Sequence, residues 1–193
     1  AGPNYNKQWV AFDPVDLKSS LGLACAATKQ ALKLLDQASP VEQALIRPLA
    51  KRYPLNEPGN VTPIWNEDYA AAMREVYLSH MDDLDVAALF AEAIMNRTPW
   101  LLWDIKTGKP AEGAATAEAI AVLERAMATA SGMNHPGILH MYIHLMEMSP
   151  HPERALRAGD ALCSLVPDAG HLIHMPTHID VLCGNYKDVI DRN

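Results

Sequence analysis

Histidine residues recur in pairs at helical spacing in the last third of this sequence. His140 and His144 are four residues apart, and so are His174 and His178, and the second pair follows the first by 34 residues at both members. Side chains four residues apart lie on one face of an α-helix, with Cβ atoms roughly 5–6 Å apart. We therefore expect two helices that each carry a pair of imidazoles on one face.

Imidazoles that converge from adjacent helices are typical of transition-metal sites. Neutral imidazole is the commonest protein ligand for Zn, Cu, Ni and Fe. Neighbouring helices pack about 8–10 Å apart, so that side chains from both can reach one ion. We predict a site for a transition-metal ion (Cu, Zn or Fe) whose ligands are His140, His144, His174 and His178, with His171 as a further ligand. Oxidative chemistry by Cu or Fe and Lewis-acid hydrolysis by Zn both fit four imidazoles.

Glu147 is the candidate catalytic residue. It follows His144 by three residues and is therefore expected on the same helical face. Its carboxylate can coordinate the metal, accept a hydrogen bond that orients an imidazole, or act as a general base. The segment is not the H-E-x-x-H motif of zinc peptidases, because its glutamate does not lie between the two histidines.

The same histidines also have a purely structural interpretation. One pair four residues apart arises often by chance, and the duplication of an inert repeat would copy that pair. Two pairs at one fixed period are harder to attribute to chance, so the pattern favours a metal or ligand site over inert histidines.

Helices are expected to position these side chains, and no stretch of the sequence predicts a strand. The chain is rich in Ala, Leu and Met, which favour helix, and its apolar residues recur at helical spacing. Asp13-Pro14 and Ser39-Pro40 are typical helix starts, in which an N-cap residue precedes proline. The predicted helices span residues 15–37, 40–52, 66–80, 83–96, 116–129, 136–148 and 153–165, then one that carries the second histidine pair and ends at Cys183-Gly184, and finally 186–193.

Residues 97–114 interrupt this succession of helices. The segment is long for a turn and carries a run of apolar residues from Trp100 to Trp103. It is either a lid over a site, as long loops in compact domains often are, or a loop that packs on the core through its tryptophans. Residues 1–12 carry turn formers and aromatic side chains, and we expect them to be a connector laid against the first helix.

Pro176 falls between the members of the second histidine pair. Within a helix, proline removes one backbone hydrogen bond and kinks the axis. As the first residue of a new helix, it would leave His171 and His174 in a turn. The sequence does not decide between these two arrangements.

Residues 136–193 resemble tetratricopeptide (TPR) repeats, which are helix–turn–helix units with a period of 34 residues. The clearest units span 136–167 and 170–193. The residues that carry the resemblance are Tyr142 and Ile143 in the first helix, Ala155 in the second, Pro167 at the close of the unit, and the turn Gly184-Asn185-Tyr186. More narrowly, the histidine-rich segments look like a divergent group of TPR-domain proteins, from which no activity can be carried over.

The resemblance implies one domain over residues 1–193, an all-α, right-handed superhelix of stacked antiparallel helix pairs with an insertion at 97–114. In TPR arrays the first helix of each pair lines a concave groove. The groove positions fall here on His140, His144, Glu147, His171, His174 and His178. Two functions fit this geometry. One is a metal-dependent enzyme whose groove holds the ion and a small-molecule ligand, and the other is a scaffold that binds a peptide partner without catalysis.

Composition limits the class of protein. A chain of 193 residues fits one domain with a sizeable core. The net charge of −7 and the lack of a basic stripe argue against a nucleic-acid surface, and no run of about 18 apolar residues predicts a membrane span. Three cysteines without a pattern do not indicate a disulfide framework. A cytoplasmic location is therefore the default, although a removed signal peptide is also compatible with the sequence.

Overall fold

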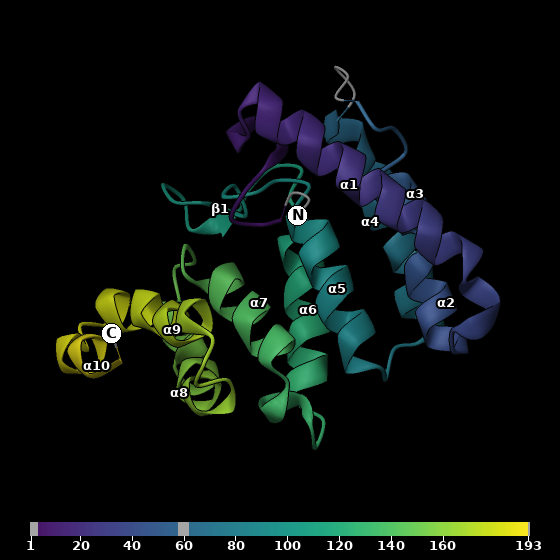
Figure 1. Ribbon diagram of the computed structural model, residues 1–193. Coiled ribbons are helices and arrows are strands. Elements are labelled where there is room, and N and C mark those ends of the chain that lie inside the picture. Colours follow the sequence, from purple (N-terminus) through teal and green to yellow (C-terminus); the bar gives the residue numbers. More distant parts are fainter. Residues whose placement is uncertain (1–3, 58–61, 193) are drawn as a thin grey trace.

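The computed structural model describes residues 4–57 and 62–192, and this part of the chain is mostly helical. The helices follow one another across the molecule, from α1–α3 at one end to α9 and α10 at the other (Figure 1). The predicted all-α class is confirmed. Within the described residues, no helix has both the length and the apolar character that crossing a membrane requires.

The α-helices are α1 (Pro14–Lys33), α2 (Pro40–Ile46), α3 (Leu49–Arg52), α4 (Thr62–Ser79), α5 (Leu84–Met95), α6 (Thr116–Met127), α7 (Pro136–Met146), α8 (Leu156–Leu165), α9 (Gly170–Cys183) and α10 (Tyr186–Arg192). Short 3₁₀ helices lie at Trp9–Ala11, Leu35–Gln37, Gly132–Asn134 and Pro152–Ala155.

The helix ends follow the capping signals of the sequence. Asp13 accepts two backbone N–H groups from the first turn of α1, and Ser39 and Glu42 form a reciprocal capping box at the start of α2. At the end of α9, Gly184 has a φ of 79°, in the left-handed region that glycine adopts without steric cost. The single helix expected over residues 40–52 is instead split into α2 and α3 next to Pro48, which has no N–H to continue the helical ladder.

The main hydrophobic core lies between the helices from α4 to α9. Helix α5 contacts α4, α6 and α7, and α7 in turn contacts α8 and α9. The fully buried side chains of this core include Met73, Phe90, Ile94, Leu123, Ile143 and Met146. Burial of one such side chain contributes roughly 1.5–3 kcal/mol, so the core holds α7 in place between its neighbours.

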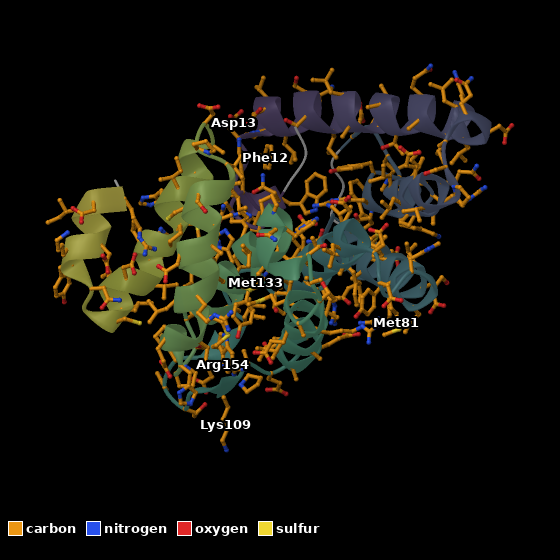
Figure 2. The ribbon with its side chains drawn as sticks, turned by 90° about the horizontal axis from the view of Figure 1, so that it is seen from below. Phe12, Asp13, Met81, Lys109, Met133 and Arg154 are labelled. Atoms are coloured by element: carbon orange, nitrogen blue, oxygen red, sulfur yellow. The ribbon has the colours of Figure 1, made fainter. Side chains whose placement is uncertain are left out.

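The insertion contains a small hairpin, so the expectation that the chain holds no strand was wrong. Strands β1 (Trp103–Asp104) and β2 (Lys109–Pro110) pair in antiparallel register, with Trp103 opposite Pro110. The turn between them forms because the Asp104 carboxylate accepts the Lys106 N–H and the Thr107 hydroxyl. Lys109 of β2 extends away from the helices into solvent (Figure 2).

The inner end of the insertion packs on the helix that carries the first histidine pair. Leu102 and Trp103 are buried, and the Trp103 indole N–H donates to the Leu145 carbonyl at 2.7 Å. Leu145 lies in the last turn of α7, where backbone carbonyls have no partner within the helix. This hydrogen bond therefore satisfies a carbonyl at the C-terminal end of α7. Trp100 behaves differently, because its side chain is 41 % exposed and its φ is 60°.

Helix α9 continues through Pro176 without a break, which decides between the two arrangements that the sequence left open. Pro176 is buried, and a Cβ added at Gly159 of α8 would lie 3.0 Å from the Pro176 Cβ. The close approach of α8 and α9 therefore favours glycine at position 159, because any larger side chain would make a tight contact with Pro176. His174 and His178 lie on one continuous helix, on either side of this contact.

We predict that Trp103→Phe destabilises the fold by about 1–3 kcal/mol, because the buried Leu145 carbonyl loses its donor while most of the apolar contact remains. Urea unfolding followed by far-UV circular dichroism measures the change. Trp100→Phe is the matched control, and its effect should be smaller because that ring is partly exposed. Equal losses in the two variants would show that the indole hydrogen bond does not hold α7.

Candidate metal centre

Three imidazoles from two helices converge on one position. His140 and His144 of α7 and His171 in the first turn of α9 each offer a ring nitrogen, and these three atoms lie within 4.8 Å of one another. The Nε2 atoms of His140 and His171 are 3.1 Å apart. The ring centroids of His140 and His144 are separated by 4.6 Å, as expected for side chains four residues apart on a helix. We call these three residues the histidine triad.

The grouping differs from the one that the sequence suggested. We expected His174 and His178 to join His140 and His144, whereas in the structure His171 completes the group. Helix α9 begins at Gly170, so His171 lies one helical turn before His174 and reaches His140 on α7. Repeat spacing predicts which faces meet, but it does not predict how far one helix is shifted along the other.

His174 and His178 form a second pair beside the triad. Their Nε2 atoms are 3.1 Å apart, and their rings are nearly perpendicular, with an interplanar angle of 85°. The two groups line different hollows. The hollow of about 310 Å³ is lined by Tyr5, Asn6, Met141 and the triad, and the hollow of about 470 Å³ is lined by Glu147, His174 and His178.

Glu147 connects the two groups through its two carboxylate oxygens. Oε2 accepts a hydrogen bond from His178 Nδ1 at 2.8 Å, and Oε1 lies 3.4 Å from His144 Nδ1. An ionised carboxylate can only accept hydrogen bonds, so both Nδ1 atoms must carry the proton. The Nε2 atoms of both rings are then the lone-pair nitrogens whenever the rings are neutral. Glu147 therefore selects the tautomer that a metal ion needs.

The electrostatics of the site keep the Glu147 carboxylate charged and disfavour protonation of His140 and His171, whereas the hydrogen bond to Glu147 raises the pKa of His178. Burial alone would raise the pKa of Glu147, but hydrogen bonds from His144 and His178 outweigh burial and lower the pKa to about 2. Burial lowers the pKa of His140 to about 3, and the neighbouring rings of His144 and His171 act in the same direction. Burial likewise lowers the pKa of His171. Neutral imidazoles at neutral pH are competent metal ligands.

The N-terminal turn supplies side chains to the site that the sequence did not reveal. Asn6 Nδ2 lies 3.1 Å from His171 Nε2 and 3.4 Å from His144 Nε2, so the amide covers the open side of the triad. The turn is held by Asn4, whose side-chain oxygen accepts the backbone N–H groups of Asn6 and Lys7. This connector was expected only against the first helix. Asparagines in it predict a turn, but nothing in their spacing predicts where the turn packs.

Two aromatic rings enclose His144, which is 1 % exposed. The Tyr5 ring centroid is 4.9 Å from that of His144, and the Trp100 centroid is 6.2 Å from it. Tyr5 and Trp100 also contact each other, at 5.3 Å between centroids. Burial, followed by the charge of Glu147, raises the pKa of Tyr5, so its phenol stays neutral. Trp100 thus has a left-handed backbone conformation and a ring that shields the triad. Trp103, by contrast, packs on the core.

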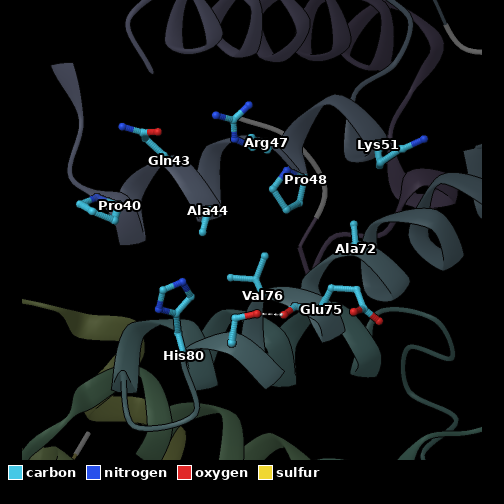
Figure 3. Close-up of a pocket in the computed structure, with 11 residues that line it drawn as sticks. Pro40, Gln43, Ala44, Arg47, Pro48, Lys51, Ala72, Glu75, Val76 and His80 are labelled. Carbon is cyan, nitrogen blue, oxygen red and sulfur yellow. Dashed lines mark hydrogen bonds between the residues drawn. The ribbon is translucent and has the colours of Figure 1, made fainter. Parts of the chain in front are cut away.

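The remaining three histidines lie outside the triad and the second pair. His135 caps α7, where its Nδ1 accepts the Ile138 N–H and its Nε2 donates to Asp85 at 3.1 Å. His151 is exposed beside Glu153. His80 lines a hollow of about 600 Å³ between α2, α3 and α4, where Ala44 and Pro48 face Val76 across the space (Figure 3). That hollow holds no other histidine, so the triad is not part of it.

Comparison of the chain with protein-family models, with curated proteins and with solved structures finds no match. The resemblance of residues 136–193 to TPR repeats therefore stays a prediction. Function must be inferred from the geometry of the site.

The free energy of unfolding should decrease as the pH is lowered, because of His140. Its pKa is about 3 in the folded chain and near its ordinary 6.5 when unfolded. As pH falls below 6.5, the unfolded chain binds this proton first, so stability that is fully present above pH 6.5 is lost progressively toward pH 3. The ordinary pKa of Glu147 is 4.5, so above that pH its carboxylate is largely ionised in both the folded and the unfolded chain. Glu147 therefore contributes little to the pH dependence in this range.

The check compares the unfolding free energies of wild type and His140→Gln between pH 4.5 and 6.5, the ordinary pKa values of the two side chains. Wild type should lose more stability than the variant as pH falls through this window. A constant difference between the two proteins would contradict the burial of a neutral ring at position 140.

Proposed function

We propose that this chain binds a transition-metal ion through His140, His144 and His171. The observation that carries the proposal is the convergence of three ring nitrogens within 4.8 Å from two helices. Two nitrogens bound to one tetrahedral ion at roughly 2.0–2.1 Å would lie about 3.3–3.4 Å apart. The 3.1 Å between His140 Nε2 and His171 Nε2 is close to that separation.

The donor set restricts the metal and its chemistry. Imidazole nitrogens suit Zn, Cu, Fe and Ni, whereas Mg and Ca prefer oxygen ligands. Three protein ligands with an open fourth position is the arrangement of catalytic zinc sites, in which water or substrate takes that position. The amide of Asn6 covers this position, so an incoming ion must displace the amide or take its oxygen as a ligand.

We propose a metal-dependent enzyme, hydrolytic or oxidative, in which Glu147 orients imidazoles. Both carboxylate oxygens face Nδ1 atoms, and a pKa of about 2 makes this carboxylate a weak base. These contacts favour the orienting role over a role as general base. Carboxylates that orient metal-bound histidines typically contribute 10–100-fold to metal affinity.

The proposed framework is a TPR-like array of stacked helix pairs. In support, α5, α7 and α9 contact one another in succession, α6 packs on α5 and α7, and α8 packs on α7 and α9. Such an array places equivalent helices of successive units side by side. The alternative is a TPR-like scaffold that binds a peptide without catalysis. That function requires no metal, so a titration of the protein with metal ions distinguishes the two.

We expect isothermal titration of tag-free protein with Zn²⁺ to show stoichiometric binding that His171→Ala weakens by more than about 100-fold, because a lost ligand should cost more than a lost orienting group. His151→Ala is the matched control, since it removes an exposed histidine from outside the site. Wild-type protein that binds no Zn²⁺, Cu²⁺ or Fe²⁺ would overturn the proposal, and equal weakening in both variants would contradict the assigned ligands.

A further inference from the structure

We infer that His174 and His178 form a second metal position, distinct from the triad and linked to it through Glu147. The inference rests on the proposed metal-binding function and adds a second ion to it. It predicts a two-metal site that takes a small molecule through an oxygen atom.

The geometry of the pair matches that of the triad. The Nε2 atoms of His174 and His178 are 3.1 Å apart, the same separation as between His140 and His171. An ion about 2.05 Å from both nitrogens would have an N–metal–N angle of roughly 100°, within the range of tetrahedral and square-planar ions. The nearly perpendicular rings, at 85°, let both nitrogens approach one position without a clash between the rings.

The proton on His178 is fixed by Glu147. Its Nδ1–H donates to Glu147 Oε2 at 2.8 Å, which leaves the Nε2 lone pair directed toward His174 when the ring is neutral. The other carboxylate oxygen faces His144 of the triad at 3.4 Å. One buried carboxylate therefore orients a ligand of each proposed ion, an arrangement that couples the two positions.

Two contacts constrain the backbone of α9 between His174 and His178. Pro176 lies between the two histidines and packs closely on Gly159 of α8. The Thr177 hydroxyl donates to the His174 carbonyl at 2.7 Å, which adds a second constraint to the same turn. A backbone that is ordered before binding reduces the entropy lost when the ion arrives.

The second position has room for an exogenous ligand. The pair opens on the hollow of about 470 Å³, whose wall includes Val181, Leu182 and Val189. Two protein nitrogens leave at least two coordination positions for water or for a substrate oxygen. The apolar wall fits the hydrocarbon part of a small molecule that binds the metal through a carbonyl, carboxylate or hydroxyl group.

Metal stoichiometry tests this inference. Tag-free protein is loaded with Zn²⁺ alone, freed of excess metal by gel filtration and assayed by elemental analysis, with folding of each variant checked by circular dichroism. We expect two ions in wild type and in His151→Ala. One ion should remain in His178→Ala and one in His171→Ala. His178→Gln serves as a second variant if the alanine protein does not fold.

The outcomes separate the inference from the function on which it rests. One ion in wild type that survives His178→Ala and is lost in His171→Ala overturns the second position and leaves the triad intact. One ion lost in both variants indicates a single shared centre and also overturns the inference. No ion in wild type overturns the proposed function itself.

Discussion

A buried carboxylate between two imidazoles is the interaction on which the site depends. Glu147 lies just after the last turn of α7, and its oxygens face His144 of the same segment and His178 of α9. A carboxylate removed from water costs several kcal/mol unless it is paired and hydrogen-bonded. Two N–H donors offset that cost here. The bond to His178 joins the end of α7 to α9, and the two bonds together determine which nitrogen of each ring carries the proton.

The rest of the fold brings these helices into position. Helix α7 contacts α5, α6, α8 and α9. A carbonyl in its last turn accepts a hydrogen bond from Trp103, and His135 caps its N-terminus. The rings of Tyr5 and Trp100 pack against His144. A rigid helix on a well-packed core can hold ligand atoms within the tolerance that metal binding requires. The insertion and the N-terminal turn therefore both pack against the histidine triad, although they are far apart in the sequence.

The sequence predicted the helical class, most helix starts and the histidines of the site. Capping residues such as Asp13 and Ser39 act through local contacts, and i,i+4 spacing is a property of the helix itself, so both can be read without tertiary information. What depends on tertiary packing could not be predicted in this way. The shift of α9 along α7 decides that His171 faces His140, and the fold of the N-terminal turn decides that Asn6 covers the triad. The β1–β2 hairpin was missed because each strand has only two residues, too few to show alternation.

Anomalous diffraction at the zinc edge, from crystals of tag-free protein loaded with Zn²⁺, tests the central claim most directly. The structure predicts a peak about 2.0–2.1 Å from ring nitrogens of His140, His144 and His171. A map whose peaks lie only on surface histidines such as His151, with no density at the triad, would contradict it.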